Sequence, residues 1–82
     1  MEKIYKFAKK FRFAFNYCED FITGTINCFM IAPKTDIVFD YTLIDEKECI
    51  YVNGERFDSD LERALSYYED ILILKGEFKG LH

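Results

Sequence analysis

Residues 36–44, DIVFDYTLI, decide the fold, because apolar and polar side chains alternate along this stretch. Alternation with a period of two is typical of a β-strand that buries one face. Asp40 and Thr42 fall on the polar face of such a strand. Its apolar face carries Ile37, Phe39, Tyr41 and Leu43. The stretch therefore predicts a strand that packs one side against a second layer of structure.

Two further strands are predicted on either side of this central one. Residues 25–31, TINCFMI, are rich in β-branched and aromatic residues, and a turn with the chain's single proline follows them. Residues 49–52, CIYV, end at Asn53-Gly54, a strong turn signal that would close a tiny hairpin onto residues 55–57. Short turns impose antiparallel neighbours. The middle of the chain thus predicts a three-stranded antiparallel meander.

The N-terminal part of the chain predicts a helix over residues 2–22. Apolar residues recur there in steps of three and four, which makes a stripe about 120° wide on a helical wheel. The stripe contains Ile4, Phe7, Ala8, Phe11, Ala14, Phe15, Cys18 and Ile22. Gly24 follows it, where a left-handed residue would end the helix. Residues 11–17 also alternate as a strand would, but the helical pattern is longer and ends with a stop signal.

A second helix is predicted over residues 60–75. Ser59 and Glu62 have the S-x-x-E spacing of a capping box, and Gly76 follows the last periodic residue. The apolar stripe consists of Leu61, Ala64, Leu65, Tyr68, Ile71 and Leu72. Together these elements predict an α+β fold in two layers, ordered helix, three-stranded meander, helix, as a single domain over residues 1–82.

Composition narrows the class of protein. The 82 residues have a net charge of −4, and half of them are hydrophobic, which argues against disorder and against a general nucleic-acid binder. Charge is uneven, because residues 1–12 hold five Lys/Arg and one Glu, whereas residues 13–82 hold six Lys/Arg and fourteen Asp/Glu. We expect no signal peptide and no membrane span. The odd number of cysteines predicts a reduced, cytoplasmic protein. The residue usage, rich in Ile, Phe, Tyr, Lys, Asp and Glu, suggests a low-GC bacterial host or its phage.

Residues that could carry catalysis are few. The single histidine, His82, is the last residue and a poor position for a general base. Cys18, Cys28 and Cys49 have no metal-ligand spacing, and we expect them to be reduced and buried. The four glycines form no phosphate-binding motif. We therefore predict a protein that is not an enzyme, with no catalytic residues, no metal and no cofactor.

Two surfaces are candidates for binding a partner protein. The first is an acidic face, whose carboxylates could imitate nucleic-acid phosphates. It consists of Asp45, Glu46, Glu48, Glu55, Asp58, Asp60, Glu62, Glu69 and Asp70. The second combines the basic face of the first helix and its exposed aromatics with an apolar pair on the second helix. It consists of Lys6, Lys9, Lys10, Phe13, Tyr17, Ile73 and Leu74.

The predicted order of helix, three strands and helix resembles that of double-stranded-RNA-binding domains. The resemblance covers topology alone. Asp58, Asp60 and Glu62 stand where that family has a lysine cluster, which disfavours RNA binding. In size, acidity and element order the chain is also similar to small phage anti-CRISPR proteins. That similarity implies a protein that occupies the nucleic-acid groove of a nuclease, but no motif assigns the chain to either family.

These observations leave three hypotheses for function. The first is a small acidic protein of a phage or mobile element that inhibits a host nucleic-acid-directed enzyme, of anti-CRISPR or antirestriction type, by binding a basic partner. The second is a small regulatory or assembly module. It would form a homo-oligomer, such as a homodimer, or dock a partner, through the face of the first helix or through the edge at Ile73 and Leu74. The third is weak nucleic-acid binding by the basic N-terminal segment. Its cations are Lys3, Lys6, Lys9, Lys10 and Arg12, with Tyr5 or Phe13 stacking on bases.

Overall fold

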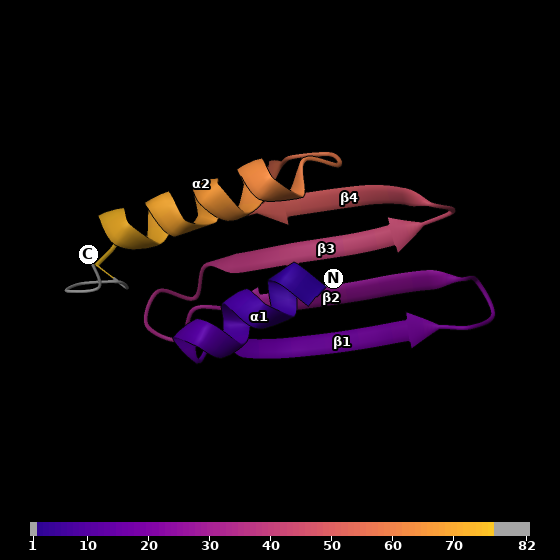
Figure 1. Cartoon of the computed structure of the whole chain (residues 1–82), viewed down its shortest axis with the longest axis horizontal. Helices are drawn as coiled ribbons and strands as arrows, with labels where there is room; N and C mark the ends of the chain where they lie inside the picture. The colour runs from indigo at the N-terminus through magenta and orange to yellow at the C-terminus, as the bar shows by residue number, and fades with distance from the viewer. Residues whose placement is uncertain (1, 77–82) are drawn as a thin grey trace.

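A computed structural model describes residues 2–76 of the chain. Two helices, α1 (Glu2–Phe11) and α2 (Leu61–Leu74), flank five strands in the sequence. The strands are β1 (Ala14–Asp20), β2 (Thr25–Ile31), β3 (Val38–Ile44), β4 (Lys47–Val52) and β5 (Glu55–Arg56). They form one antiparallel sheet in the order β1-β2-β3-β4-β5 (Figure 1). The predicted two layers, the second helix and the hairpin onto residues 55–57 are confirmed.

The predicted three-stranded meander is wrong, because residues 14–20 form strand β1 and not the second half of a helix. The helix stops at Phe11, where Arg12 adopts a positive φ of 59° and turns the chain. The Phe13 amide then donates to the Ala8 carbonyl at 2.8 Å. The alternation over residues 11–17 was the correct signal. With five strands, the element order no longer matches that of the double-stranded-RNA-binding domains.

A tight turn joins β1 to β2 and ends β1 at Asp20. The Asp20 carboxylate accepts from the backbone N–H of Ile22 at 2.9 Å and of Thr23 at 3.3 Å. These bonds lower the pKa of Asp20. Gly24, at a φ of 73°, belongs to this turn and does not end a helix. A residue with a side chain would be strained at that φ, so the glycine fits the turn.

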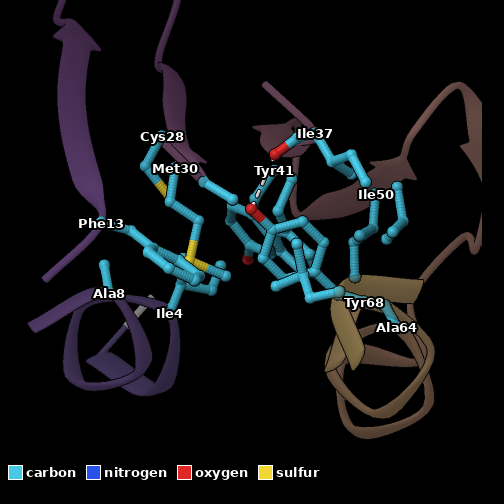
Figure 2. Close-up of a cluster of buried hydrophobic side chains, with 14 residues drawn as sticks. Ile4, Ala8, Phe13, Cys28, Met30, Ile37, Tyr41, Ile50, Ala64 and Tyr68 are labelled. Carbon is cyan, nitrogen blue, oxygen red and sulfur yellow. Dashed lines mark hydrogen bonds between the residues drawn. The ribbon is translucent and has the colours of Figure 1, made fainter. Parts of the chain in front are cut away.

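Both helices lie on the same face of the sheet and bury one hydrophobic core against it (Figures 1 and 2). Helix α1 contributes Ile4 and Ala8, which are buried as predicted. Tyr68 of α2 is fully buried, and its hydroxyl donates to the Ile37 carbonyl at 2.8 Å. The fully buried strand residues beneath the helices are Cys28, Met30, Phe39, Ile50 and Val52.

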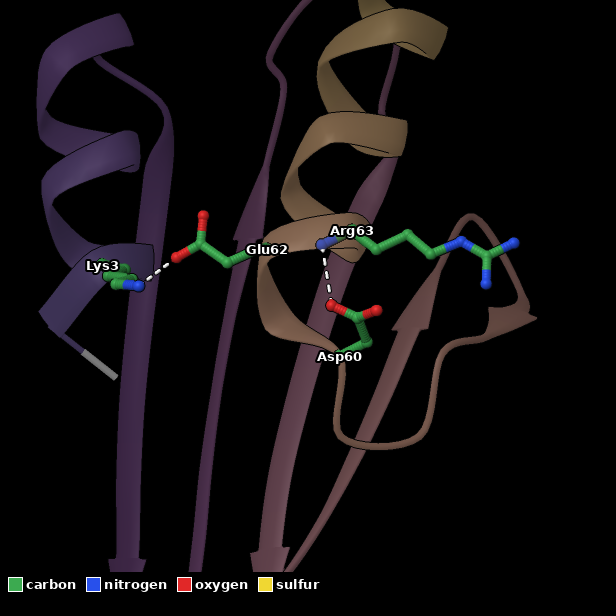
Figure 3. A network of polar contacts seen from close by, with 4 residues as sticks. All are labelled: Lys3, Asp60, Glu62 and Arg63. Atoms are coloured by element: carbon green, nitrogen blue, oxygen red, sulfur yellow. Dashed lines mark hydrogen bonds and ion pairs between the residues drawn. The ribbon is translucent and has the colours of Figure 1, made fainter.

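Helix α2 begins differently from the predicted capping box. Asp60 is the N-cap, and its carboxylate accepts from the Arg63 backbone N–H at 3.1 Å (Figure 3). Glu62, the expected partner of Ser59, instead pairs with Lys3 of α1. The two helices are thus joined by an ion pair at their N-terminal ends. Gly76 follows the last turn with a φ of 84°, as predicted for a helix end.

Candidate functional site: an uncovered sheet face and a charged edge

The sheet is covered on one side only, and its other side, which we call the open face, is rich in apolar residues. Residues directly opposite in antiparallel strands point to the same face. Met30 and Phe39 are opposite and buried under the helices, so their neighbours point the other way. The larger apolar residues of the open face are Phe29, Ile31, Val38, Ile44 and Tyr51. The exposed fraction of Val38, Ile44 and Tyr51 lies between 36% and 48%.

This composition is unusual for a sheet face in water. An antiparallel sheet that packs one face on a core usually carries polar residues on the other. Here Ile31 lies directly opposite Val38, and Phe29 and Tyr51 lie on either side of Asp40 in neighbouring strands. Exposed apolar patches with a polar surround commonly mark binding surfaces. The open face is therefore the strongest candidate for a contact surface.

A polar cluster on the open face is satisfied within the sheet. The Asn27 amide Nδ2 donates to Asp40 Oδ1 at 2.8 Å and to Thr42 Oγ1 at 2.9 Å. These three side chains come from the adjacent strands β2 and β3. Because they bind one another, they hold the strands in register. A partner could therefore cover the neighbouring apolar side chains without breaking these hydrogen bonds.

The predicted acidic face is gathered only in part, along the edge formed by β4, β5 and the loop into α2. Two adjoining grooves of about 450 and 370 Å³ lie there and share Arg56, Asp58 and Ser59. The carboxylates that line them are Glu46, Glu48, Glu55, Asp58 and Asp60. Three cations, Lys47, Arg56 and Arg63, line the same grooves. This charged edge is therefore mixed in sign and does not present an uninterrupted row of carboxylates.

Several acidic side chains of this predicted set already bind groups of their own chain. Asp58 accepts from Arg56 Nε at 2.8 Å, and Asp60 caps α2. Glu48 accepts from the Tyr41 hydroxyl at 2.6 Å; burial first, and then this bond, raise the pKa of Tyr41. Glu62 pairs with Lys3 (Figure 3).

The other predicted acidic residues do not line these grooves. Asp45 lies in the turn between β3 and β4, and Glu69 and Asp70 lie on the C-terminal half of α2. A helix rises about 1.5 Å per residue, so the last two are about 14 Å along the helix from Asp60.

The second predicted surface is not one face. Phe13 is only 8% exposed and lies in the core, so its expected exposure is wrong. Its ring instead lies 6.3 Å from that of Tyr68. Tyr17 is half-exposed on β1, and its hydroxyl donates to Glu19 at 2.8 Å, which raises the pKa of Tyr17. Ile73 and Leu74 are exposed near the end of α2.

The basic residues of α1 are partly engaged as well. Lys6 pairs with Glu2 at 3.1 Å, one helical turn away, and Lys3 pairs with Glu62. Lys9 and Lys10 lie in the last turn of the helix, where cations complement the helix dipole. Both pairs are exposed and weak, but phosphates would have to compete with them.

The sequence analysis did not predict the open face, because it assigned each strand a single apolar face that packs against the helices. The signal was present at Val38 and Ile44, which fall on the same side of the central strand as Asp40 and Thr42. In residues 25–31 the apolar side chains likewise fall on both faces. A strand with apolar residues on both faces is typical of one that is covered on both sides.

The three cysteines lie in different environments, so the expectation that all are buried is wrong. Cys28 is buried in the core, Cys49 is half-buried and Cys18 is exposed. Burial raises the pKa of the Cys28 thiol to about 11. That thiol is therefore protonated at neutral pH and is a poor nucleophile. Within residues 2–76, no group of three or more His, Cys, Asp or Glu side chains is placed to hold a metal ion.

Because the pKa of Cys28 is raised, we expect the folded protein to lose stability at alkaline pH. An unfolded thiol ionises near its ordinary pKa of 9.0, whereas the folded thiol ionises near 11. Stability from this group is thus complete below about pH 9 and decreases as pH rises towards about 11. The urea midpoint should fall from about pH 9 to about pH 10, and less so in Cys28→Ala. An equal fall in that variant would contradict the assignment.

Comparison with protein-family models, curated proteins and solved structures gives no match for this chain. Among residues 2–76, no helix is long and apolar enough to cross a membrane. His82, which the sequence analysis considered as a catalytic base, lies outside the described residues.

Proposed function

We propose that this chain is a non-enzymatic binding protein that docks a partner protein on the open face of its sheet. The single observation that carries the proposal is the apolar character of that face. Tyr51, Val38 and Ile44 remain substantially exposed there, on a sheet whose other side already has a complete core. Aromatic residues with adjacent aliphatic ones are typical of the centre of protein interfaces.

The charge of the chain indicates the chemistry of the partner. Residues 13–82 hold fourteen acidic and six basic residues. The charged edge around Glu55 and Asp58 borders the sheet on the side of β4 and β5. A partner that presents apolar side chains within a basic surface would match both features. Basic, nucleic-acid-directed enzymes, the class predicted from the sequence, have such surfaces, and their inhibition is part of the proposal.

The mixed sign of the charged edge bears on the mechanism. A mimic of a nucleic-acid backbone needs unpaired carboxylates in a row, whereas Arg56 and Arg63 interrupt those of Glu55, Asp58 and Asp60. The charged edge is therefore better suited to attracting a basic partner during association than to taking the place of nucleic-acid phosphates in its groove. Affinity then depends mainly on the apolar residues of the open face, and salt mainly affects the association rate.

The test replaces the apolar side chains of the open face by threonine, a residue that strands tolerate well. The variant Ile31→Thr/Val38→Thr/Tyr51→Thr should keep its circular dichroism spectrum. We expect it to lose at least about tenfold in affinity for the partner, because exposed apolar anchors dominate interfaces. Quantitative pull-down from a bacterial lysate would identify the partner, and titration with that purified partner would measure the loss.

The matched control removes apolar side chains from the exposed end of α2. Ile73→Ser/Leu74→Ser tests the alternative interface and should leave affinity unchanged. A partner that binds the threonine variant as tightly as the parent chain contradicts the proposal. So does a threonine variant whose only change is in the mass of its own oligomer, since the open face would then serve self-association.

A further inference from the structure

Strand β1 is an edge strand with one long side open to another chain. Its seven residues pair with β2 without a break in register, from Ala14 opposite Ile31 to Asp20 opposite Thr25. All are exposed except Phe15. Proteins usually protect such an edge with proline, lysine or a bulge. The sequence AFNYCED holds no proline and no lysine, and its only charges are at the last two positions.

The opposite edge of the sheet is protected, which distinguishes the two. Strand β5 has only two residues, Glu55 and Arg56, both of them charged. The chain then turns away through Asp58 into α2. Short, charged edge strands are a common defence against unwanted pairing. The same defence is missing at β1, so β1 is the edge open to pairing.

The two ends of β1 carry opposite charge. Lys9, Lys10 and Arg12 lie just before it, and Glu19 and Asp20 close it. An antiparallel pair of two β1 strands would bring the basic end of each copy beside the acidic end of the other. A parallel pair would place like charges together, which is unfavourable. Charge therefore favours a second copy of this chain in the antiparallel orientation.

We propose that two copies of the chain pair through β1, antiparallel, with Tyr17 opposite Tyr17 at the two-fold axis. In this register Ala14 lies opposite Asp20 and Phe15 opposite Glu19, so no like charges are directly opposed. The two five-stranded sheets then join into one continuous sheet. The open faces of both copies then form a single surface, although the dimer does not depend on the proposed function.

The same register would bring an exposed aromatic residue, in the turn after β1, into contact with the other copy. Phe21 is 86% exposed, although it follows directly after Asp20. Continuing the register sets Phe21 of one copy at the level of Phe13 of the other. Counted in steps of two along the strand, both positions have the same parity as Phe15, which lies opposite the buried Met30 on the helix side. Phe21 would then lie beside the partner's aromatic cluster of Phe7, Phe11 and Phe13.

Sedimentation equilibrium on the full chain tests the dimer. The parent protein should dimerise, more weakly in high salt because exposed opposite charges contribute. Tyr17→Lys and Tyr17→Glu each place two like charges at the two-fold axis and should weaken the dimer by at least about tenfold. An equimolar mixture of the two variants should restore it, because the opposed charges then attract. A monomeric parent chain, or a dimer that both variants leave unchanged, overturns the proposal.

Disulfide cross-linking tests the register. Cys18 of one copy should lie opposite Asn16 of the other, so Asn16→Cys should give a covalent dimer with oxidised glutathione. The matched control, Lys47→Cys, creates the same spacing beside Cys49 on β4 and should form no covalent dimer under the same conditions. Equal cross-linking of both variants would show random collision and overturn the register. The threonine variant of the open face should dimerise as the parent does, which separates this proposal from the proposed function.

Discussion

Replacing Tyr68 by alanine should cost about 3–5 kcal/mol of stability, enough to unfold a large share of the molecules. Tyr68 is fully buried at the centre of the core. Its ring lies 5.4 Å from that of Phe39 and 5.9 Å from that of Phe7, so it joins α2 both to the sheet and to α1. The loss would appear as a lower urea midpoint, followed by circular dichroism.

Two further variants serve as controls. One measures the contribution of the Tyr68 hydroxyl alone, and the other measures the effect of removing a partly buried ring next to it. Tyr68→Phe should cost about 1 kcal/mol, because the Ile37 carbonyl still accepts from the Ala32 amide at 3.2 Å. Tyr67→Ala changes the adjacent residue, which is only partly buried and packs on Phe57. Its cost should be clearly smaller. A Tyr68→Ala protein as stable as Tyr67→Ala would show that Tyr68 does not organise the core.

Replacing Phe13 by alanine should cost about 3 kcal/mol, and the result decides between two structures of the N-terminal segment. In a helix over residues 2–22, Phe13 would be exposed, and alanine would be neutral or slightly stabilising. In the structure, Phe13 lies after the end of α1 and is buried against Phe7 and Tyr68. Urea unfolding measures the difference directly.

Phe21→Ala is the control for this substitution. It removes the same ring from the turn between β1 and β2, where the side chain is 86% exposed. Its effect on the monomer should stay within about 0.5 kcal/mol, as for most exposed positions. Similar losses for the two variants would contradict the burial of Phe13. Both variants should be compared at a low protein concentration, so that self-association does not add to the apparent stability.

The segment over residues 11–20 shows why periodicity failed at one place. Phe11, Phe15 and Cys18 fit a helix, whereas Phe11, Phe13, Phe15 and Tyr17 fit a strand. Local preference cannot separate the two, since aromatic residues occur in both. The choice depends on β2, whose outer edge would lack backbone partners without β1. Pairing seven residues with β2 is more favourable than extending the helix over them. Arg12, at a positive φ, provides the turn between helix and strand.

The candidate contact surface was harder to predict from the sequence than the fold. Asp45, Glu46 and Asp58 lie in turns, as expected, whereas Glu48 and Glu55 lie in strands β4 and β5. The partners of the acidic side chains were not foreseen. Glu62 pairs with Lys3, which is 59 residues away in the chain. Glu48 accepts from Tyr41 across two strands. The contact of Glu62 with Lys3 joins distant segments and leaves no local pattern in the sequence, whereas those of Asp58 with Arg56 and of Asp60 with Arg63 are local.

By itself the sequence determined the core of α2, the strands over residues 25–31 and around 36–44, and an α+β domain in two layers. Those elements follow from periodic burial and turn chemistry, which are local properties. Tertiary structure alone decided that residues 14–20 add an edge strand and that Phe13 is buried. The physical reason is that backbone pairing and burial are satisfied between segments. Only their assembly shows which face of the sheet remains uncovered.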